Sequence, residues 1–198
     1  MDLKIYHCVI DEDIESGLEV NFVSLVDRPA IGRNFLTFSE QEQKLAFAVN
    51  DEEMIISGPA MIADLPIYRK DEELGEYYTV FDKASIKAIA LKFFKKGYNQ
   101  SFNLQHKEGS AQTCVTIFQS FLTNEAMGIM PLKGYEDVAD GSWFLAAKVD
   151  DPKLWAEIKA GNYRGFSVEG LFSYIKKETE EQMLAQLESL LSKLSKLN

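Results

Sequence analysis

The stretch that most limits the fold is residues 152–172, where a short helix runs directly into a strand carrying a serine between two glycines. Asp151 suits the cap of this helix, Pro152 its first position and Gly161 its end. The strand then reads Gly165-Phe166-Ser167-Val168-Glu169-Gly170. Glycine allows a sharp turn or a close approach of backbone, so this serine can be presented to a substrate. The alternative is a strand with a hydrophobic core face whose serine simply faces outward.

This serine does not belong to a lipase-type nucleophile elbow. That elbow reads Gly-x-Ser-x-Gly on a strand, a turn and a helix, in that order. Here Gly165 and Gly170 enclose one residue more, and Ser167 follows a helix and opens a strand. The order of elements therefore argues against an α/β-hydrolase.

The rest of the chain alternates short strand-like runs with one further clear helix. Apolar residues at steps of three and four predict that helix, with Asp82 and Gly97 suited to its two ends: Ile86, Ile89, Ala90, Phe93 and Phe94. Further short apolar segments include Phe35, Phe38, Phe47 and Val49. The predicted strands cover residues 3–10, 18–26, 54–62 with a break at Gly58-Pro59, 76–81 after a charged hairpin-like loop, 102–106, 115–122 and 143–149. This pattern predicts an α+β fold, strand-rich, built as a partly closed β-barrel with flanking helices.

Charge and composition exclude several classes of function. The net charge is −10 and the pI about 4.8, which argues against nucleic acid as a partner, because phosphate binding needs clustered lysine and arginine. No run of 18 apolar residues predicts a membrane span, and the first residues do not resemble a signal peptide. The two cysteines and two histidines lie at positions unrelated to any metal-ligand spacing, so no metal site is expected. The sequence has no glycine-rich phosphate-binding loop, so no cofactor is expected. Cys8 and Cys114 are typical of small hydrophobic residues in a reducing compartment.

The last segment differs from the rest. Residues 179–182 have the form of a capping box, and a leucine stripe follows at steps of four and three: Met183, Leu187, Leu190, Leu194 and Leu197. An isolated helix of this length is marginal in water, so it must dock on a partner, on a second copy or on its own domain. We therefore expect one domain over residues 1–175 and a C-terminal amphipathic helix over residues 176–198.

A serine becomes a useful nucleophile when a base takes its proton, and histidine is the usual base near neutral pH. His7 lies in the first predicted strand, a setting typical of a structural histidine. His106 ends a short strand beside a polar loop, from which a side chain can reach a cleft. Glu169 follows Ser167 by two residues and so faces the same side of a regular strand. Arg164 could stabilise an oxyanion, or it could simply be exposed.

Six segments stand out in a fixed order along roughly residues 18–172: Val23-Ser24-Leu25-Val26-Asp27-Arg28-Pro29-Ala30-Ile31, Asn103-Leu104-Gln105-His106, the strand 115–122, Gly141-Ser142-Trp143, Asp150-Asp151-Pro152-Lys153-Leu154-Trp155 and on to Gly161, and Gly165-Phe166-Ser167-Val168-Glu169-Gly170. Together and in this order they resemble one known family, the XkdF-type phage serine proteases, a branch of the prohead proteases of tailed phages.

The resemblance implies both a fold and a function. Prohead proteases are similar to the herpesvirus maturation protease, a β-barrel with surrounding helices. They act as endopeptidases in the host cytoplasm, inside the procapsid, on scaffold and major capsid proteins. The family's nucleophile matches Ser167 and its base matches His106. Backbone N–H groups near the serine, such as that of Val168, with Arg164 as a further candidate, would hold the oxyanion. The C-terminal helix fits a tether to the scaffold or a contact between copies.

One position departs from the family pattern. The strand after the histidine usually carries a glutamate where this chain has Gln119. Glutamine can accept a hydrogen bond but supplies no charge, so the third catalytic member is expected to be Glu169, with Gln119 as the alternative. The competing hypothesis is a catalytically silent protease fold that serves as a scaffold or structural component of the phage particle. A third is an unrelated hydrolase or small-molecule-binding domain.

Overall fold

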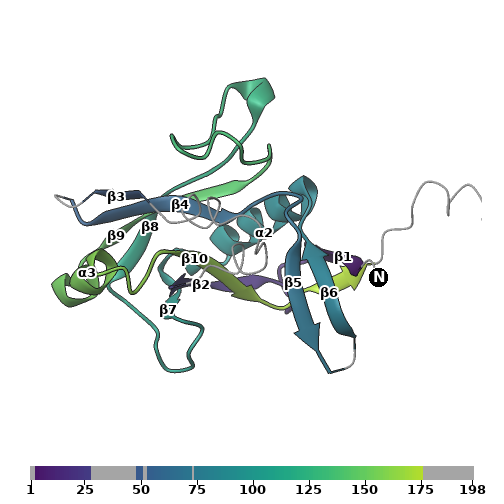
Figure 1. Ribbon diagram of the computed structural model, residues 1–198, viewed down its shortest axis with the longest axis horizontal. Helices are drawn as coiled ribbons and strands as arrows, with labels where there is room; N and C mark the ends of the chain where they lie inside the picture. Colours follow the sequence, from purple (N-terminus) through teal and green to yellow (C-terminus); the bar gives the residue numbers. More distant parts are fainter. Residues whose placement is uncertain (1–2, 28–47, 51–52, 73, 176–198) are drawn as a thin grey trace, which may run out of the picture.

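The structure is a computed structural model that describes residues 3–27, 48–50, 53–72 and 74–175. Within these residues the strands form three open sheets, accompanied by two α-helices (Figure 1). The first sheet has the order β11 (Ser173–Ile175), β1 (Lys4–Val9), β6 (Gly75–Val80) and β5 (Ile67–Asp71). The second has the order β10 (Gly165–Gly170), β2 (Val20–Val26) and β7 (Phe102–Leu104). The third has the order β3 (Ala48–Asn50), β4 (Ile55–Met61), β9 (Trp143–Val149) and β8 (Val115–Leu122).

The helices are α2 (Lys83–Lys95) and α3 (Pro152–Lys159), with short 3-10 turns η2 (Tyr98–Gln100) and η3 (Glu125–Met127). The predicted α+β class is confirmed, and β8 and β9 have the bounds that the sequence predicted. The expected break in the strand at 54–62 appears as a register shift between Pro59 and Met61. The described strands do not close into a barrel. β5 and β11 were not predicted, and the C-terminal helix and the segments around Phe35 and Phe38 lie outside the described residues.

Helix α2 joins two of the sheets through a hydrophobic core. Asp82 accepts a hydrogen bond from the Ser85 N–H at the helix start, and Gly97, with φ +74°, follows its end. The buried face includes Phe93, whose ring meets the edge of Trp143 on β9 at 5.5 Å between ring centroids. Phe94, expected on the same face, is partly exposed. In Figure 1, α2 lies in the middle of the molecule, and it contacts β2 and β9.

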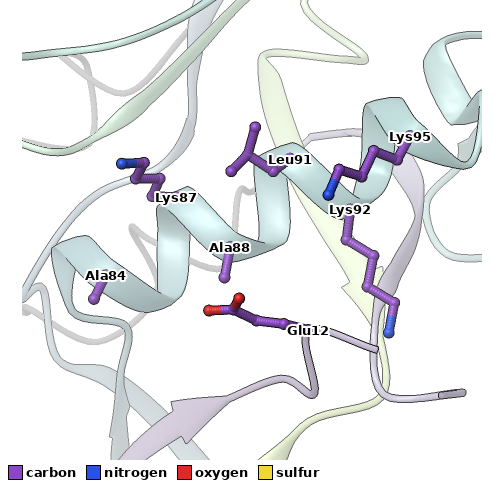
Figure 2. A pocket seen from close by; sticks show the side chains of 7 residues that line it. All are labelled: Glu12, Ala84, Lys87, Ala88, Leu91, Lys92 and Lys95. Carbon is purple, nitrogen blue, oxygen red and sulfur yellow. The ribbon is translucent and has the colours of Figure 1, made fainter. Parts of the chain in front are cut away.

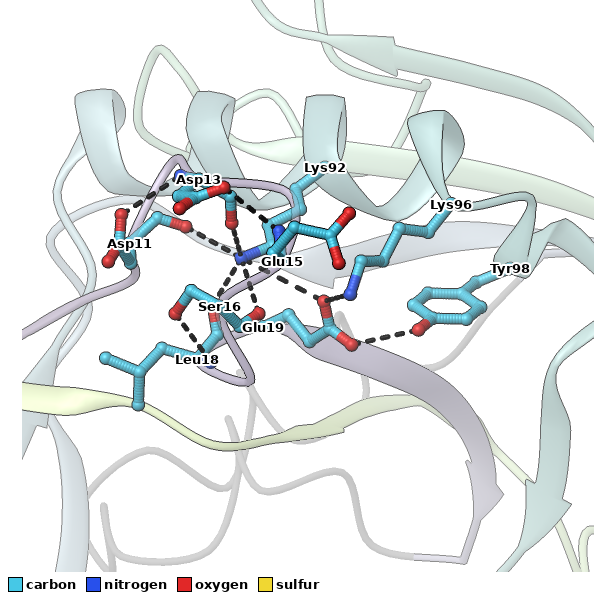
Figure 3. A network of polar contacts seen from close by, with 9 residues as sticks. All are labelled: Asp11, Asp13, Glu15, Ser16, Leu18, Glu19, Lys92, Lys96 and Tyr98. Carbon is cyan, nitrogen blue, oxygen red and sulfur yellow. Dashed lines mark hydrogen bonds and ion pairs between the residues drawn. The ribbon is translucent and has the colours of Figure 1, made fainter.

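The buried Lys92 of α2 binds the loop before β2 through hydrogen bonds (Figure 3). Lys92 is 3% exposed, and its ammonium group donates hydrogen bonds at 2.6–3.1 Å to four backbone carbonyls, those of Asp11, Asp13, Ser16 and Leu18. The carboxylate of Glu19 lies 3.9 Å away and also pairs with Lys96. Because a buried charge needs both a counter-charge and hydrogen-bond partners, this arrangement fixes where β2 begins.

The pairing of β2 places three polar residues in line across the second sheet. β2 is antiparallel to β10 and parallel to β7, so that Ser24 lies opposite both Ser167 and Asn103. A bulge between Glu169 and Gly170 ends the regular register. At Gly170 a Cβ would collide with the backbone carbonyl of Glu19, so this close approach of two strands requires glycine.

Neither helix of the described part has the length and apolar character needed to cross a membrane. The division at residue 175 stays a prediction, since the segment beyond it is outside the described residues.

Candidate active site

Ser167 and His106 meet although they are 61 positions apart. The hydroxyl oxygen of Ser167 on β10 lies 3.0 Å from Nε2 of His106, a hydrogen-bond distance. Ser167 is 4% exposed, while the His106 side chain is 38% exposed at the edge of the sheet. The two residues that the sequence singled out as nucleophile and base are therefore brought together with the geometry that proton transfer needs.

The backbone around His106 differs from the expected strand over residues 102–106. β7 ends at Leu104, and both Gln105 and His106 have φ of +54°, in the left-handed region. The Gln105 N–H donates to the Leu25 carbonyl at 3.0 Å, and the Lys107 N–H donates to the Leu104 carbonyl at 3.0 Å, closing a turn. The predicted strand over residues 102–106 therefore ends two residues early, and His106 lies in a turn rather than on the strand. The turn carries its ring back across the sheet toward Ser167 instead.

The other ring nitrogen of His106 has two neighbours. Its Nδ1 lies 2.8 Å from the hydroxyl oxygen of Ser24 and 3.3 Å from Oε2 of Glu169. Ser24 also donates to the side-chain oxygen of Asn103, and the Asn103 amide donates to Glu169 Oε2 at 2.6 Å. The side chains of these four residues form a closed set of contacts behind the base.

The two candidates for a third catalytic member lie in different places. Glu169 is beside His106, on the face of β10 that carries Ser167. Gln119 is exposed on β8 in the third sheet, paired with Ala146 of β9. The ring nitrogens of His106 lie within hydrogen-bond distance of Ser24, Ser167 and Glu169. On geometry, the acidic neighbour of the base is Glu169.

Sequence reasoning missed Ser24 and Asn103. Asn103 lies in the short strand just before the histidine, and Ser24 is the polar residue within the apolar run Val23-Ser24-Leu25-Val26. Both are buried: Ser24 is 0% exposed and Asn103 is 7% exposed. A polar side chain flanked by apolar ones in a strand is a signal for a buried hydrogen bond, although it does not say which partner the fold will bring.

The two candidate oxyanion groups differ in their surroundings. Val168 follows the nucleophile directly and is half-buried, opposite Val23. Arg164 is exposed, and its Nε donates to the carbonyl of Gly161 at 3.1 Å, where α3 has ended. Its guanidinium also borders a hollow of about 290 Å³ that Asp27, Gln105 and Asn162 line. The contact of Arg164 is thus with the end of the helix rather than with the Ser167 hydroxyl.

A small, mostly apolar hollow of about 40 Å³ borders Ser167. Its apolar walls come from β4, β5, β10 and their neighbours: Ala60, Met61, Ile62, Ile67, Phe81, Val168 and Phe172. Arg69 is the charged residue in this lining. A larger hollow, about 340 Å³, lies along α2 between Glu12 and the lysines Lys87 and Lys95 (Figure 2). That hollow shares no lining residue with the serine site, and its long lysine side chains are typical of a solvated helix face.

The described residues contain no group of three or more histidine, cysteine or acidic side chains placed to hold a metal ion. The side chains gathered at Ser167 are a histidine, a carboxylate and two buried polar residues.

Comparison with known proteins gives one match. The family described as "Putative phage serine protease XkdF" matches residues 43–176, about two thirds of the chain. The matched range includes Asn103, His106, Ser167 and Glu169, and Ser24 precedes it. No curated protein and no solved structure matches the chain.

Proposed function

The chain belongs to the XkdF family of phage serine proteases, and on this premise we propose that it is a serine endopeptidase with Ser167 as nucleophile and His106 as general base. The observation that carries the proposal is the 3.0 Å contact between the Ser167 hydroxyl and Nε2 of His106. Glu169 is the third member, since its carboxylate is the acid beside Nδ1 of the base.

The reaction follows the serine-protease template. His106 Nε2 takes the Ser167 proton while Oγ attacks the peptide carbonyl, and the imidazolium then gives that proton to the leaving amine. The resulting acyl-enzyme is attacked by water, whose proton passes to His106 and returns to Ser167 as the acid product leaves. The negative charge of Glu169 favours the imidazolium that forms in both steps.

The oxyanion is held by backbone N–H groups next to the nucleophile, that of Val168 among them, because such donors need no reorganisation during the reaction. Arg164 would join them only by leaving the Gly161 carbonyl that it contacts. Backbone donors are therefore the first choice, and Arg164 the second.

The substrate is a protein segment that places a small apolar side chain in the hollow beside Ser167. We propose that the substrates are the scaffold and major capsid proteins of the phage, cut during head maturation inside the procapsid in the host cytoplasm. A fold like that of the herpesvirus maturation protease, with a partly closed barrel, belongs to this proposal. So does docking on scaffold, or on a second copy, through residues 176–198.

The test is mass spectrometry of wild-type and Ser167→Ala protein, each incubated with the capsid and scaffold proteins of the same phage. New peptides are expected with the wild type and not with the variant. Ser142→Ala is a matched control, because Ser142 is also a buried hydrogen-bonded serine but contacts Ala63 and Ala139. Cleavage that continues unchanged in Ser167→Ala would exclude this serine as the nucleophile.

A second candidate function is a catalytically silent assembly protein. Two observations favour it: the nucleophile is only 4% exposed, and apolar side chains are exposed on β8 and the connection after it, at Phe118, Met127 and Met130. Under this hypothesis Ser167→Ala has no effect on particle assembly, and deletion of residues 176–198 prevents it. Peptides produced by the wild type alone would decide for the protease.

A further inference from the structure

In the hydrogen bonds behind His106, each group can be assigned as a donor or an acceptor. The assignment starts from Glu169. An ionised carboxylate only accepts hydrogen bonds, so the side-chain nitrogen of Asn103 must donate to it. This orients the Asn103 amide with its oxygen toward Ser24. That oxygen only accepts, so the Ser24 hydroxyl gives it its single proton.

The hydroxyl of Ser24, having given its proton to Asn103, can act only as an acceptor toward Nδ1 of His106. Nδ1 must then carry the ring proton. Nε2 is left unprotonated and faces the hydroxyl of Ser167 at 3.0 Å. This is the tautomer that a general base for Ser167 requires.

Distance and burial both favour this indirect route over the direct contact with Glu169. Nδ1 is 2.8 Å from Ser24 and 3.3 Å from Glu169, and the mode for an N–H···O bond is about 2.9–3.0 Å. Ser24 is fully buried, whereas the Glu169 side chain is 43% exposed, so water competes with the direct contact. A buried hydrogen bond is also stronger in its low local dielectric.

We propose that Ser24 and Asn103 are positioning residues that hold His106 in the Nδ1-protonated tautomer, and that Glu169 acts on the histidine mainly through Asn103. Strand pairing makes this possible, because Ser167, Ser24 and Asn103 lie opposite one another on β10, β2 and β7. The role of Ser24 and Asn103 in catalysis rests on the proposed function. Their effect on the His106 tautomer is independent of it.

The tautomer can be measured by NMR of protein labelled with 15N-histidine, without any substrate. The chain has two histidines, so His7→Gln assigns the signals. We expect the Nδ1-protonated form in the wild type and a mixture with the Nε2-protonated form in Ser24→Ala. Ser142→Ala, which removes an equally buried serine elsewhere, is expected to leave the signals of His106 unchanged. An unchanged tautomer in folded Ser24→Ala would overturn the role of Ser24.

A second pair of variants tests the route from Glu169 and keeps the proposal falsifiable if Ser24→Ala does not fold. In Glu169→Gln the new amide can donate or accept, so Asn103 loses its fixed orientation and a tautomer mixture is expected. Adding Asn103→Asp places a carboxylate, which can only accept, directly against the Ser24 hydroxyl. The double variant Asn103→Asp/Glu169→Gln is then expected to recover the Nδ1-protonated form. No recovery would mean that the direct contact of Glu169 governs the base.

Activity gives an independent readout. In Ser24→Ala we expect kcat to fall by about 10²-fold with KM nearly unchanged, the lower end of what a positioned general base contributes. Ser24→Thr keeps the hydroxyl and is expected to recover most of kcat. A protein with the expected tautomers but no cleavage of any substrate would refute the proposed protease and leave the positioning role intact. Cleavage by the wild type, together with a His106 tautomer that stays the same in every variant, would support the protease and refute the positioning role.

Discussion

Gln105 and His106 are consecutive residues with the same left-handed backbone angle, φ of +54° at each. Left-handed backbone costs an L-residue other than glycine about 1–2 kcal/mol, and most for a β-branched side chain. The strain lies at the turn that carries the base to Ser167. It persists because Gln105 and Lys107 donate backbone hydrogen bonds on either side of His106.

This strain predicts opposite effects for two substitutions at Gln105. Gln105→Val should lower the free energy of unfolding by about 1–2 kcal/mol, whereas Gln105→Gly should be neutral or stabilising. Urea unfolding measures both. Gln119→Val is the control, because Gln119 is exposed on strand β8 beside a register shift and its φ is not positive, so valine is tolerated there. Equal loss in the two valine variants would contradict a special backbone at Gln105.

The buried ammonium of Lys92 predicts a large loss of stability when its charge is removed. Lys92→Met leaves four backbone carbonyls without their donor and weakens the pairing of Glu19. Breaking a buried charge pair on one side costs about 3–5 kcal/mol, and we expect an effect of that order in urea unfolding. Lys95→Met, at an exposed position of the same helix, should change stability by less than about 0.5 kcal/mol. Similar losses for the two lysines would show that the network contributes little.

Glu19 predicts sensitivity to acid. Burial works against ionisation of its carboxyl, but hydrogen bonds from Lys96 and Tyr98 and the charges of Lys96 and Lys92 outweigh it and lower the pKa. A group with a lowered folded-state pKa stabilises the fold above its unfolded-state pKa, 4.5 here, and loses this contribution as the pH falls through the folded value. The free energy of unfolding should therefore fall more steeply below pH 4.5 in the wild type than in Glu19→Gln. If the free energies of unfolding of the wild type and Glu19→Gln fell in parallel with pH, Glu19 would not contribute to the acid sensitivity.

The two cysteines should differ in reactivity. Burial raises the pKa of the Cys8 thiol from 9.0 to about 11, although the charge of Arg69 and a hydrogen bond with Thr79 work against the rise. Cys114 is only half-buried. Because the thiolate is the reactive form, a thiol reagent at pH 8 should modify Cys114 first, and Cys114→Ser should abolish the fast phase. Fast labelling of Cys8 in the native protein would contradict its burial.

The raised pKa of Cys8 also makes stability depend on pH. Since the pKa of the Cys8 thiol is higher in the folded than in the unfolded chain, its contribution to stability is complete below pH 9 and is lost as the pH rises through 11.

Under the proposed function, the hollow beside Ser167 predicts a size limit for the substrate side chain that enters it. Ala60→Val extends a side chain of the wall into this hollow of about 40 Å³, while the side chains of His106 and Ser167 themselves stay unchanged. For a peptide that fills the hollow, KM should rise by about tenfold while kcat changes little, the order of effect of one methylene in a pocket. A matched peptide with glycine at that position should be cleaved as before. Equal effects on both peptides would indicate general damage to the site.

The sequence predicted local elements better than their assembly. α2 and α3 were predictable because caps and apolar periodicity are local, and β8 and β9 because long apolar runs end at clear turns. β11 was missed because three residues carry no period, and its pairing with β1 is set by the remote ends of the described chain. The partly closed barrel expected from many short strands is not confirmed by the described strands, which form three open sheets, since strand order is a non-local property.

The candidate site divides in the same way. Ser167 and His106 could be named from residue type, local context and family resemblance, and the structure brings them together. Ser24 could not be named as a neighbour of His106, because their contact joins residues 82 positions apart through parallel pairing of β2 with β7. The direction of the His106 ring also depends on two positive φ angles that no sequence pattern indicated.

The strand order of the second sheet also has a consequence in time. A ribosome delivers the chain from its N-terminus, so β2 and β7, with Ser24, Asn103 and His106, are synthesised well before β10 brings the nucleophile. A nascent chain that ends before β10 therefore holds His106, Ser24 and Asn103, but neither the nucleophile nor Glu169. Any chemistry at Ser167 has to wait until β10 has been made and has docked beside β2.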